Sequence, residues 1–95
     1  MNKKAAPATI LNLISERHET HGDYAENARI SQNIKSMMHD PAGDTGWEQL
    51  PSYAKESLEM IALKISRILS GRWDTADHWK DIAGYAMLVA ERCSK

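Results

Sequence analysis

The chain has 95 residues, a length that suits one domain and leaves little room for a second. Its 12 Lys and Arg residues and 13 Asp and Glu residues give a net charge of −1, which excludes the basic excess of a general nucleic-acid binder. Cys93 is the only cysteine, so we expect neither an intrachain disulfide nor a cysteine-based zinc site, and a reducing compartment follows.

The beginning of the chain predicts a flexible tail over residues 1–7. Its two lysines are followed by no long apolar run, so no signal peptide is expected. The apolar runs elsewhere are too short to span a bilayer. We therefore expect a single helical domain over residues 1–95, located in the cytoplasm.

The first half of the chain predicts two helices, because apolar residues recur at helical spacing between glycine and proline breaks. One helix is expected over residues 8–20, ending before Gly22. The next is expected from Asp23 to Met38, because Asp23 and Glu26 have the spacing of a capping box. Residues 39–50 contain one proline and two glycines, so we expect a loop there.

The second half predicts two longer helices. Residues 51–70 have the clearest helical period, with Gly71 as the expected C-cap. Residues 75–92 follow, with Asp74 as the expected N-cap. Four helices with short connections predict an all-α, compact four-helix bundle. Because the core of so small a domain is marginal, we expect a homo-oligomer, joined through the face of the last helix that carries Gly84, Tyr85 and Leu88.

Two pairs of carboxylates predict a metal site. Glu56 and Glu59 are three residues apart and Asp77 and Asp81 are four apart, so each pair projects from one side of its helix. If the two helices pack side by side, the four side chains converge. Their carboxylate oxygens are ligands of the kind that Mg²⁺ prefers. The alternative is structural, with Asp77 as a helix cap and the glutamates paired to neighbouring basic residues.

Two basic residues on the third predicted helix have the spacing of a phosphate clamp. Lys64 and Arg67 are three residues apart, and arginine binds phosphate oxygens through two parallel hydrogen bonds. A nucleotide or another phosphorylated small molecule is therefore the expected ligand. The alternative is that both side chains form ordinary ion pairs with nearby acids.

Four further residues are candidates for ligand binding. His21 and Tyr24 lie where the first two predicted helices meet, and the free N–H groups of a helix N-terminus suit an anion. Tyr85 and Trp79 are aromatic and can stack on a base. The alternative for Trp79 is a place in the core of the bundle.

Three blocks of sequence carry a resemblance to a family of short phage and prophage proteins. They are residues 21–27 (HGDYAEN), 62–68 (ALKISRI) and 77–86 (DHWKDIAGYA). The blocks run from the second helix to the end of the chain. If a phage encodes the chain, its location is the host cytoplasm.

That family in turn resembles the MazG-like all-α nucleotide pyrophosphohydrolases. The resemblance implies a helical oligomer that holds Mg²⁺ with a Glu-x-x-Glu helix and a Glu-x-x-Asp helix. Glu56-Ser-Leu-Glu59 matches the first motif. Asp77 and Asp81 depart from the second, because they are spaced by four and an aspartate replaces the glutamate.

Three functions are consistent with these features. The first is Mg²⁺-dependent hydrolysis of a nucleotide. The second is binding without turnover, which would sequester a cyclic or modified nucleotide signal of bacterial anti-phage defence. The third is a structural or protein-interaction module. Dependence of ligand binding on Mg²⁺ separates the first two, and failure to bind any nucleotide indicates the third.

Overall fold

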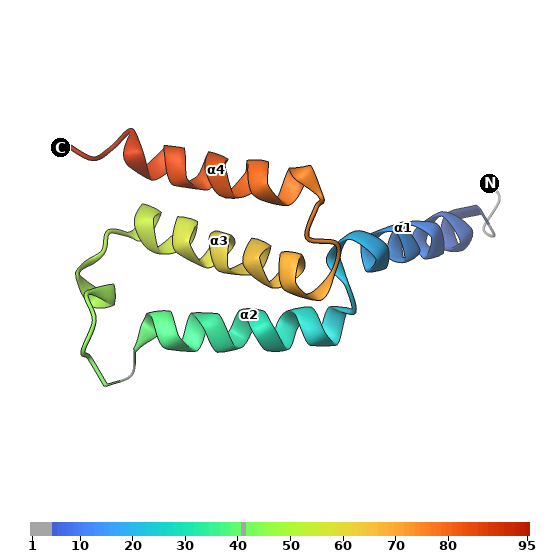
Figure 1. Cartoon of the computed structure of the whole chain (residues 1–95), viewed down its shortest axis with the longest axis horizontal. Coiled ribbons are helices and arrows are strands. Elements are labelled where there is room, and N and C mark those ends of the chain that lie inside the picture. The colour runs from blue at the N-terminus through green and yellow to red at the C-terminus, as the bar shows by residue number, and fades with distance from the viewer. Residues whose placement is uncertain (1–4, 41) are drawn as a thin grey trace.

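The structure, a computed structural model, describes residues 5–40 and 42–95. In chain order its helices are α1 (Ala5–His21), α2 (Tyr24–His39), the short 3-10 helix η1 (Trp47–Gln49), α3 (Ser52–Ser70) and α4 (Ala76–Ala90) (Figure 1). No strand occurs in these residues, which confirms the all-α class and the four predicted helices. None of the described helices is long and apolar enough to cross a membrane.

The observed helix ends follow local capping. Asp23 is the N-cap of α2, as predicted, and its carboxylate accepts a hydrogen bond from the Glu26 amide at 3.1 Å. Gly71 is the C-cap of α3, also as predicted. At α4, however, Thr75 is the N-cap and Asp74 instead lies 3.6 Å from the Arg72 guanidinium. The predicted N-cap was therefore one residue too early.

The ends of the chain differ from the prediction in length. α1 begins at Ala5, inside the expected tail, while residues 1–4 lie outside the described part of the chain. α4 ends at Ala90 rather than at Arg92, because the Arg92 and Cys93 amides bond to carbonyl groups only three residues back. Such tight final turns satisfy the last carbonyls of a helix and end its regular period.

The expected loop over residues 39–50 contains a helical turn of its own. α2 ends at His39, and Asp40 adopts a left-handed conformation with φ 45°. The Asp40 carboxylate accepts a hydrogen bond from the Thr45 amide at 2.6 Å. η1 follows, and its buried Trp47 stacks on His39 with 4.6 Å between the ring centres. The connection therefore closes one end of the helical layer.

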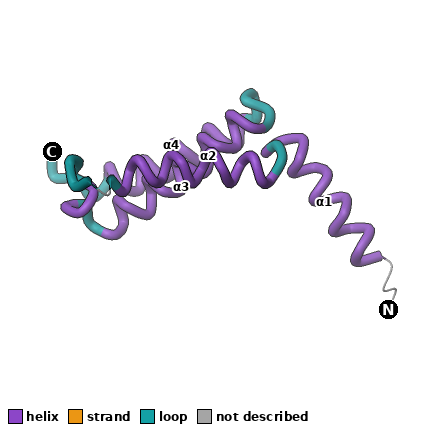
Figure 2. The backbone as a smooth tube through the Cα atoms, turned by 90° about the horizontal axis from the view of Figure 1, so that it is seen from below, coloured by secondary structure: helices purple, strands orange, loops and turns teal. Residues whose placement is uncertain are grey.

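The helices form a layer rather than a closed bundle. α2, α3 and α4 lie side by side with α3 in the middle, and α1 leaves the layer at an angle (Figures 1 and 2). The radius of gyration is 16.6 Å, whereas a compact domain of this length has about 12 Å. The four helices are as predicted, but α1 does not pack as the fourth member of a compact bundle.

Candidate functional site

Two glycines bring the two tight turns of the molecule into contact. Gly22 joins α1 to α2 with φ +80°, and Gly71 follows α3. A Cβ atom on Gly22 would lie 1.9 Å from the Ser70 carbonyl oxygen, and one on Gly71 would lie 2.3 Å from the Thr20 carbonyl oxygen. Since neither atom can be accommodated, only glycine permits this contact. We call the place where the two turns meet the elbow.

Buried polar side chains hold the elbow together. The Asn27 amide donates to the His21 carbonyl at 3.1 Å, and the Ser70 hydroxyl donates to the same carbonyl at 2.7 Å. The Ser66 hydroxyl donates to the Asn27 carbonyl oxygen at 2.8 Å. Asn27 and Ser66 are buried, and burial of polar groups is stable only when they are hydrogen-bonded. These contacts fix the last turn of α1 against α2 and α3.

His78 on α4 completes this network. Its Nε2 lies 3.0 Å from the Thr20 carbonyl oxygen, and the side chain is buried. A carbonyl oxygen can only accept, so Nε2 carries the proton. The His78 ring also meets the His21 ring edge-on at 4.8 Å between centres. The three sequence blocks, at residues 21–27, 62–68 and 77–86, therefore meet at the elbow.

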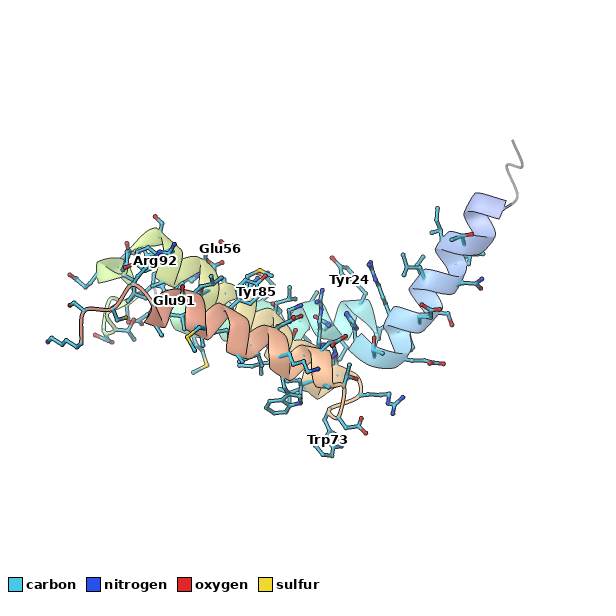
Figure 3. All side chains as sticks on the ribbon, turned by 90° about the horizontal axis from the view of Figure 1, so that it is seen from above. Tyr24, Glu56, Trp73, Tyr85, Glu91 and Arg92 are labelled. Carbon is cyan, nitrogen blue, oxygen red and sulfur yellow. The ribbon has the colours of Figure 1, made fainter. Side chains whose placement is uncertain are left out.

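A cavity of about 480 Å³ opens on the inner side of the elbow. Its rim residues Ile14, Arg17, His18 and Tyr24 are exposed, so it is open to solvent. Figure 3 shows Tyr24 in the angle between α1 and the layer, with Trp73 on the opposite side of the molecule. We call this the elbow cavity, and it is lined by Ile14, Arg17, His18, His21, Gly22, Tyr24, Asn27, Leu63 and Arg67.

The elbow cavity is cationic. Arg67 is half-buried and forms no ion pair with any described carboxylate. Burial lowers the pKa of Arg67, and the nearby positive charge of Arg17 lowers it further. Asp81 and Tyr85 act in the opposite direction. An anion placed beside the Arg67 guanidinium would offset this repulsion.

His21 is neutral at neutral pH. Partial burial, followed by the charges of Arg67, His78, Lys64 and Arg17, lowers its pKa to about 4. Its Nδ1 lies 2.6 Å from the Thr20 hydroxyl oxygen. A neutral imidazole beside two arginines can donate or accept a hydrogen bond without adding charge to the cavity.

Acidification is expected to destabilise the chain through His21. The unfolded histidine takes up a proton at its ordinary pKa near 6.5, whereas the folded one resists protonation to about 4. The unfolded state therefore binds more protons in this window, and stability falls as pH decreases from 6.5 toward 4. Urea unfolding at about pH 7 and about pH 5 should show a smaller loss of stability for His21→Gln than for the wild type.

The matched control is His18→Gln, because His18 is exposed one turn earlier on α1. Carboxyl groups such as that of Asp81, whose pKa the Lys64 hydrogen bond lowers, titrate in all three proteins. Only the difference between variants therefore reports on His21. An equal acid sensitivity of His21→Gln and the wild type would contradict the assignment.

Lys64 pairs with an acidic residue and does not line the elbow cavity. It is buried, and its Nζ lies 2.9 Å from the Asp81 carboxylate. This ion pair is the structural alternative that the sequence left open. Arg67 lies one turn later on α3 and reaches the elbow cavity instead.

The predicted carboxylates are separated along the molecule. α3 and α4 are antiparallel, with Lys64 opposite Asp81 and Tyr53 opposite Arg92, whose guanidinium lies 5.5 Å from the Tyr53 ring centre. Glu56 precedes Lys64 by eight residues, or about 12 Å along the helix. It therefore lies toward the Arg92 end of the layer (Figure 3).

The other carboxylates have different neighbours. Glu59 lies 3.8 Å from His39 of α2, and Asp77 is exposed in the first turn of α4. Among the described side chains, no group of three His, Cys, Asp or Glu residues is placed to hold a metal ion. One chain thus does not bring Glu56, Glu59, Asp77 and Asp81 together.

Tyr85 and Trp79 lie outside the elbow cavity. Tyr85 lines a separate hollow of about 420 Å³ on α4, together with Lys80, Asp81, Gly84 and Leu88. Trp79 is exposed, and its indole N–H donates to the Trp73 carbonyl at 2.7 Å. The face of α4 that carries Gly84, Tyr85 and Leu88 remains the predicted subunit contact.

Sequence reasoning missed several residues of the elbow. Arg17 was not predicted as a site residue, because a charged residue that follows the apolar residues of α1 is usually exposed to solvent. Asn27, Ser66 and His78 offered a weak signal, since such side chains are poor helix formers that bond to the backbone instead. Their position inside helices indicates a structural role, but their hydrogen-bond partners cannot be predicted from the sequence.

A family model for a domain of unknown function (DUF6378) matches residues 8–93. The match covers all four helices except the first residues of α1, so the chain belongs to this family. In the same comparisons, no curated protein and no solved structure matches the chain.

Proposed function

We propose that this DUF6378 chain binds a phosphorylated small molecule, with a nucleotide as the best candidate, in the elbow cavity. The observation that carries the proposal is Arg67, a half-buried cation beside Arg17 with no carboxylate partner among the described residues. A buried charge is costly unless it is paired. A phosphate group would supply two or more acceptor oxygens to these guanidinium groups.

The remaining walls of the elbow cavity favour a nucleotide over inorganic phosphate. Leu63 and Ile14 offer apolar surface, and Tyr24 lies at the rim with 86% of its surface exposed. Small-molecule sites combine an apolar lining with a few polar groups that fix orientation. A base can therefore lie against Tyr24 while its phosphate lies between the two arginines.

Calorimetric titration with EDTA present tests this proposal. The probes are inorganic phosphate, the nucleoside mono-, di- and triphosphates, and cyclic nucleotides. We expect saturable binding of at least one nucleotide, weaker binding of phosphate, and an increase in melting temperature on binding. Failure of every nucleotide to bind at millimolar concentration would overturn the proposal and favour a structural or protein-interaction module.

Sequestration without turnover is the form of this function that the elbow cavity supports best, because its charge comes from arginines rather than from metal ligands. The ligand should then be recovered intact after the protein is denatured. The resemblance to phage proteins makes cyclic or modified nucleotides of anti-phage defence the first group to test.

Mg²⁺-dependent nucleotide hydrolysis is the second candidate function. It is favoured by the Glu56-Ser-Leu-Glu59 spacing, which gives both carboxylates one side of α3. Under this function, Glu56, Glu59 and Asp81 would hold the metal, with Asp77 as a fourth ligand, and the products would be a nucleoside monophosphate and pyrophosphate. Because these carboxylates lie apart in one chain, such a site would need ligands from more than one copy. Turnover then requires Mg²⁺ and stops with EDTA.

Asp81→Asn separates the two functions. The substitution removes the negative charge that neutralises Lys64. If the ligand is only bound, its affinity should stay the same or increase, because more positive charge lies near the elbow cavity. If Asp81 holds catalytic Mg²⁺, hydrolysis should be lost. Titration in EDTA and product analysis with Mg²⁺ should be made on the same preparations, with Asp44→Asn in the exposed loop as control.

A further inference from the structure

α1 carries an apolar stripe that no other described part of the chain covers. Ile10, Leu11, Leu13 and Ile14 are between 44% and 65% exposed. Figure 2 shows why: α1 leaves the layer at the elbow, and no other helix runs beside it. An apolar helix face of this kind marks an interaction site.

The exposed area of the whole chain indicates how much surface remains to be covered. The chain exposes 7145 Å², whereas a compact monomer of 10.7 kDa exposes about 5500 Å². The excess, roughly 1600 Å², is what each partner buries in an obligate homodimer, where the total is about 2000–5000 Å². The excess exposed area of the chain is therefore comparable to the area that one subunit buries in a dimer.

The small core also favours a second copy of the chain as the partner. Among the described residues, the buried apolar side chains are Trp47, Ala54 and Ala62. So few fully buried apolar side chains make a small core, and small domains commonly gain stability by association. The net charge of −1 adds little repulsion between two copies.

The stripe continues directly into the elbow cavity. At about 100° per residue, Ile10, Ile14, Arg17 and His21 follow one face of α1. Ile14 belongs to both features, because it is part of the stripe and lines the elbow cavity. A partner that covers Ile14 therefore reaches the rim of the elbow cavity.

We propose that two copies of this chain associate through the α1 stripe, and that each copy closes the elbow cavity of the other. The contact is reciprocal, since a two-fold dimer presents the same surface from both partners. The closure rests on the proposed function, while the dimer itself does not. Burial by the second copy would remove water from the arginines and strengthen their interaction with a phosphate.

A pair of α1 variants tests the interface. Ile10→Asp places a charge in the stripe at a residue that is exposed and does not line the elbow cavity. Asn12→Asp adds the same charge about half a turn away, on the opposite side of α1. We expect sedimentation to give twice the 10.7 kDa chain mass for the wild type and Asn12→Asp, and the single mass for Ile10→Asp. A monomeric wild type at micromolar concentration, or an unaffected Ile10→Asp dimer, would overturn the proposal.

Isotope-filtered NMR on mixed labelled and unlabelled wild type tests the same contact without relying on a variant that could unfold. We expect intermolecular contacts to the methyl groups of Ile10, Leu13 and Ile14, and to the Tyr24 ring if the partner closes the elbow cavity. Contacts on the α4 face of Gly84, Tyr85 and Leu88 in place of α1 would overturn this interface and favour the contact predicted from the sequence. Contacts to Ile10 without any to Ile14 or Tyr24 would overturn the closure.

Binding of AMP and GMP separates a failure here from a failure of the proposed function. If the second copy forms a wall of the site, Ile10→Asp should raise the dissociation constant at least tenfold and Asn12→Asp should not. A wild-type dimer that binds neither AMP nor GMP would contradict the binding of these two nucleotides. The NMR contacts to Ile14 and Tyr24 would still show whether the second copy closes the elbow cavity. Equal affinity of Ile10→Asp and wild type would overturn the closure alone.

Discussion

Gly22→Ala is expected to cost the fold about 2–5 kcal/mol, which is a large part of the stability of so small a domain. Two effects add. Gly22 has φ +80°, a left-handed conformation that costs a residue with a Cβ atom about 1–2 kcal/mol. The new methyl group would also lie 1.9 Å from the Ser70 carbonyl oxygen. Because this neighbour is backbone, relief requires the two turns to separate.

Gly43→Ala is the matched control for Gly22→Ala. Gly43 has almost the same conformation, with φ +76°, but no atom lies within 4 Å of the position of a Cβ. It should therefore show the conformational cost without the clash. Urea unfolding of both variants measures the difference. If Gly22→Ala destabilises the chain no more than Gly43→Ala does, the two turns are not in contact as described.

Arg67→Ala is expected to weaken nucleotide binding about ten- to hundredfold, since a charge-assisted hydrogen bond to phosphate contributes about 1.5–3 kcal/mol. The side chain lines the elbow cavity and forms no ion pair within the described residues. Its removal should leave the fold intact and relieve the repulsion from Arg17. Calorimetric titration, with circular dichroism to verify helix content, is the measurement.

Arg29→Ala controls for the general loss of a positive charge. Arg29 lies on the surface of α2, is paired with Glu26 and does not line the elbow cavity. It should bind nucleotides as the wild type does. Equal losses in Arg67→Ala and Arg29→Ala would mean that binding depends on net charge and not on the elbow cavity.

The helices were predictable because their signals are local. The apolar period of α3, the Asp23 cap and the Gly71 stop each depend on residues within a few positions of one another. The direction of α1 was not predictable in this way. It is set by bonds between residues far apart, such as His78 to Thr20 across 58 positions and Ser70 to His21 across 49.

The candidate site was predictable only in part. His21, Tyr24 and Arg67 line the elbow cavity, and their role in ligand binding stays a prediction. Lys64 does not, because the antiparallel register of α3 and α4 brings Asp81 to it. The same register separates Glu56 from the acidic residues at the start of α4. The sequence predicts on which face of a helix a side chain lies, but it does not predict the register of two packed helices along their axes.

The bonds that join α1 to the other helices lie at its final turn, so a small rotation there moves the far end of the helix. The fixed point is the pair of carbonyl groups of Thr20 and His21, which accept hydrogen bonds from three side chains, one each on α2, α3 and α4, and from the Arg72 amide. From Thr20 to Ile10 the arm is about 15 Å long, so a rotation of about 10° moves its outer end by about 2.5 Å. If an anion bound at Arg17 turned α1 in this way, Ile10 would move further than Arg17, and the contact with a second copy at Ile10 would change.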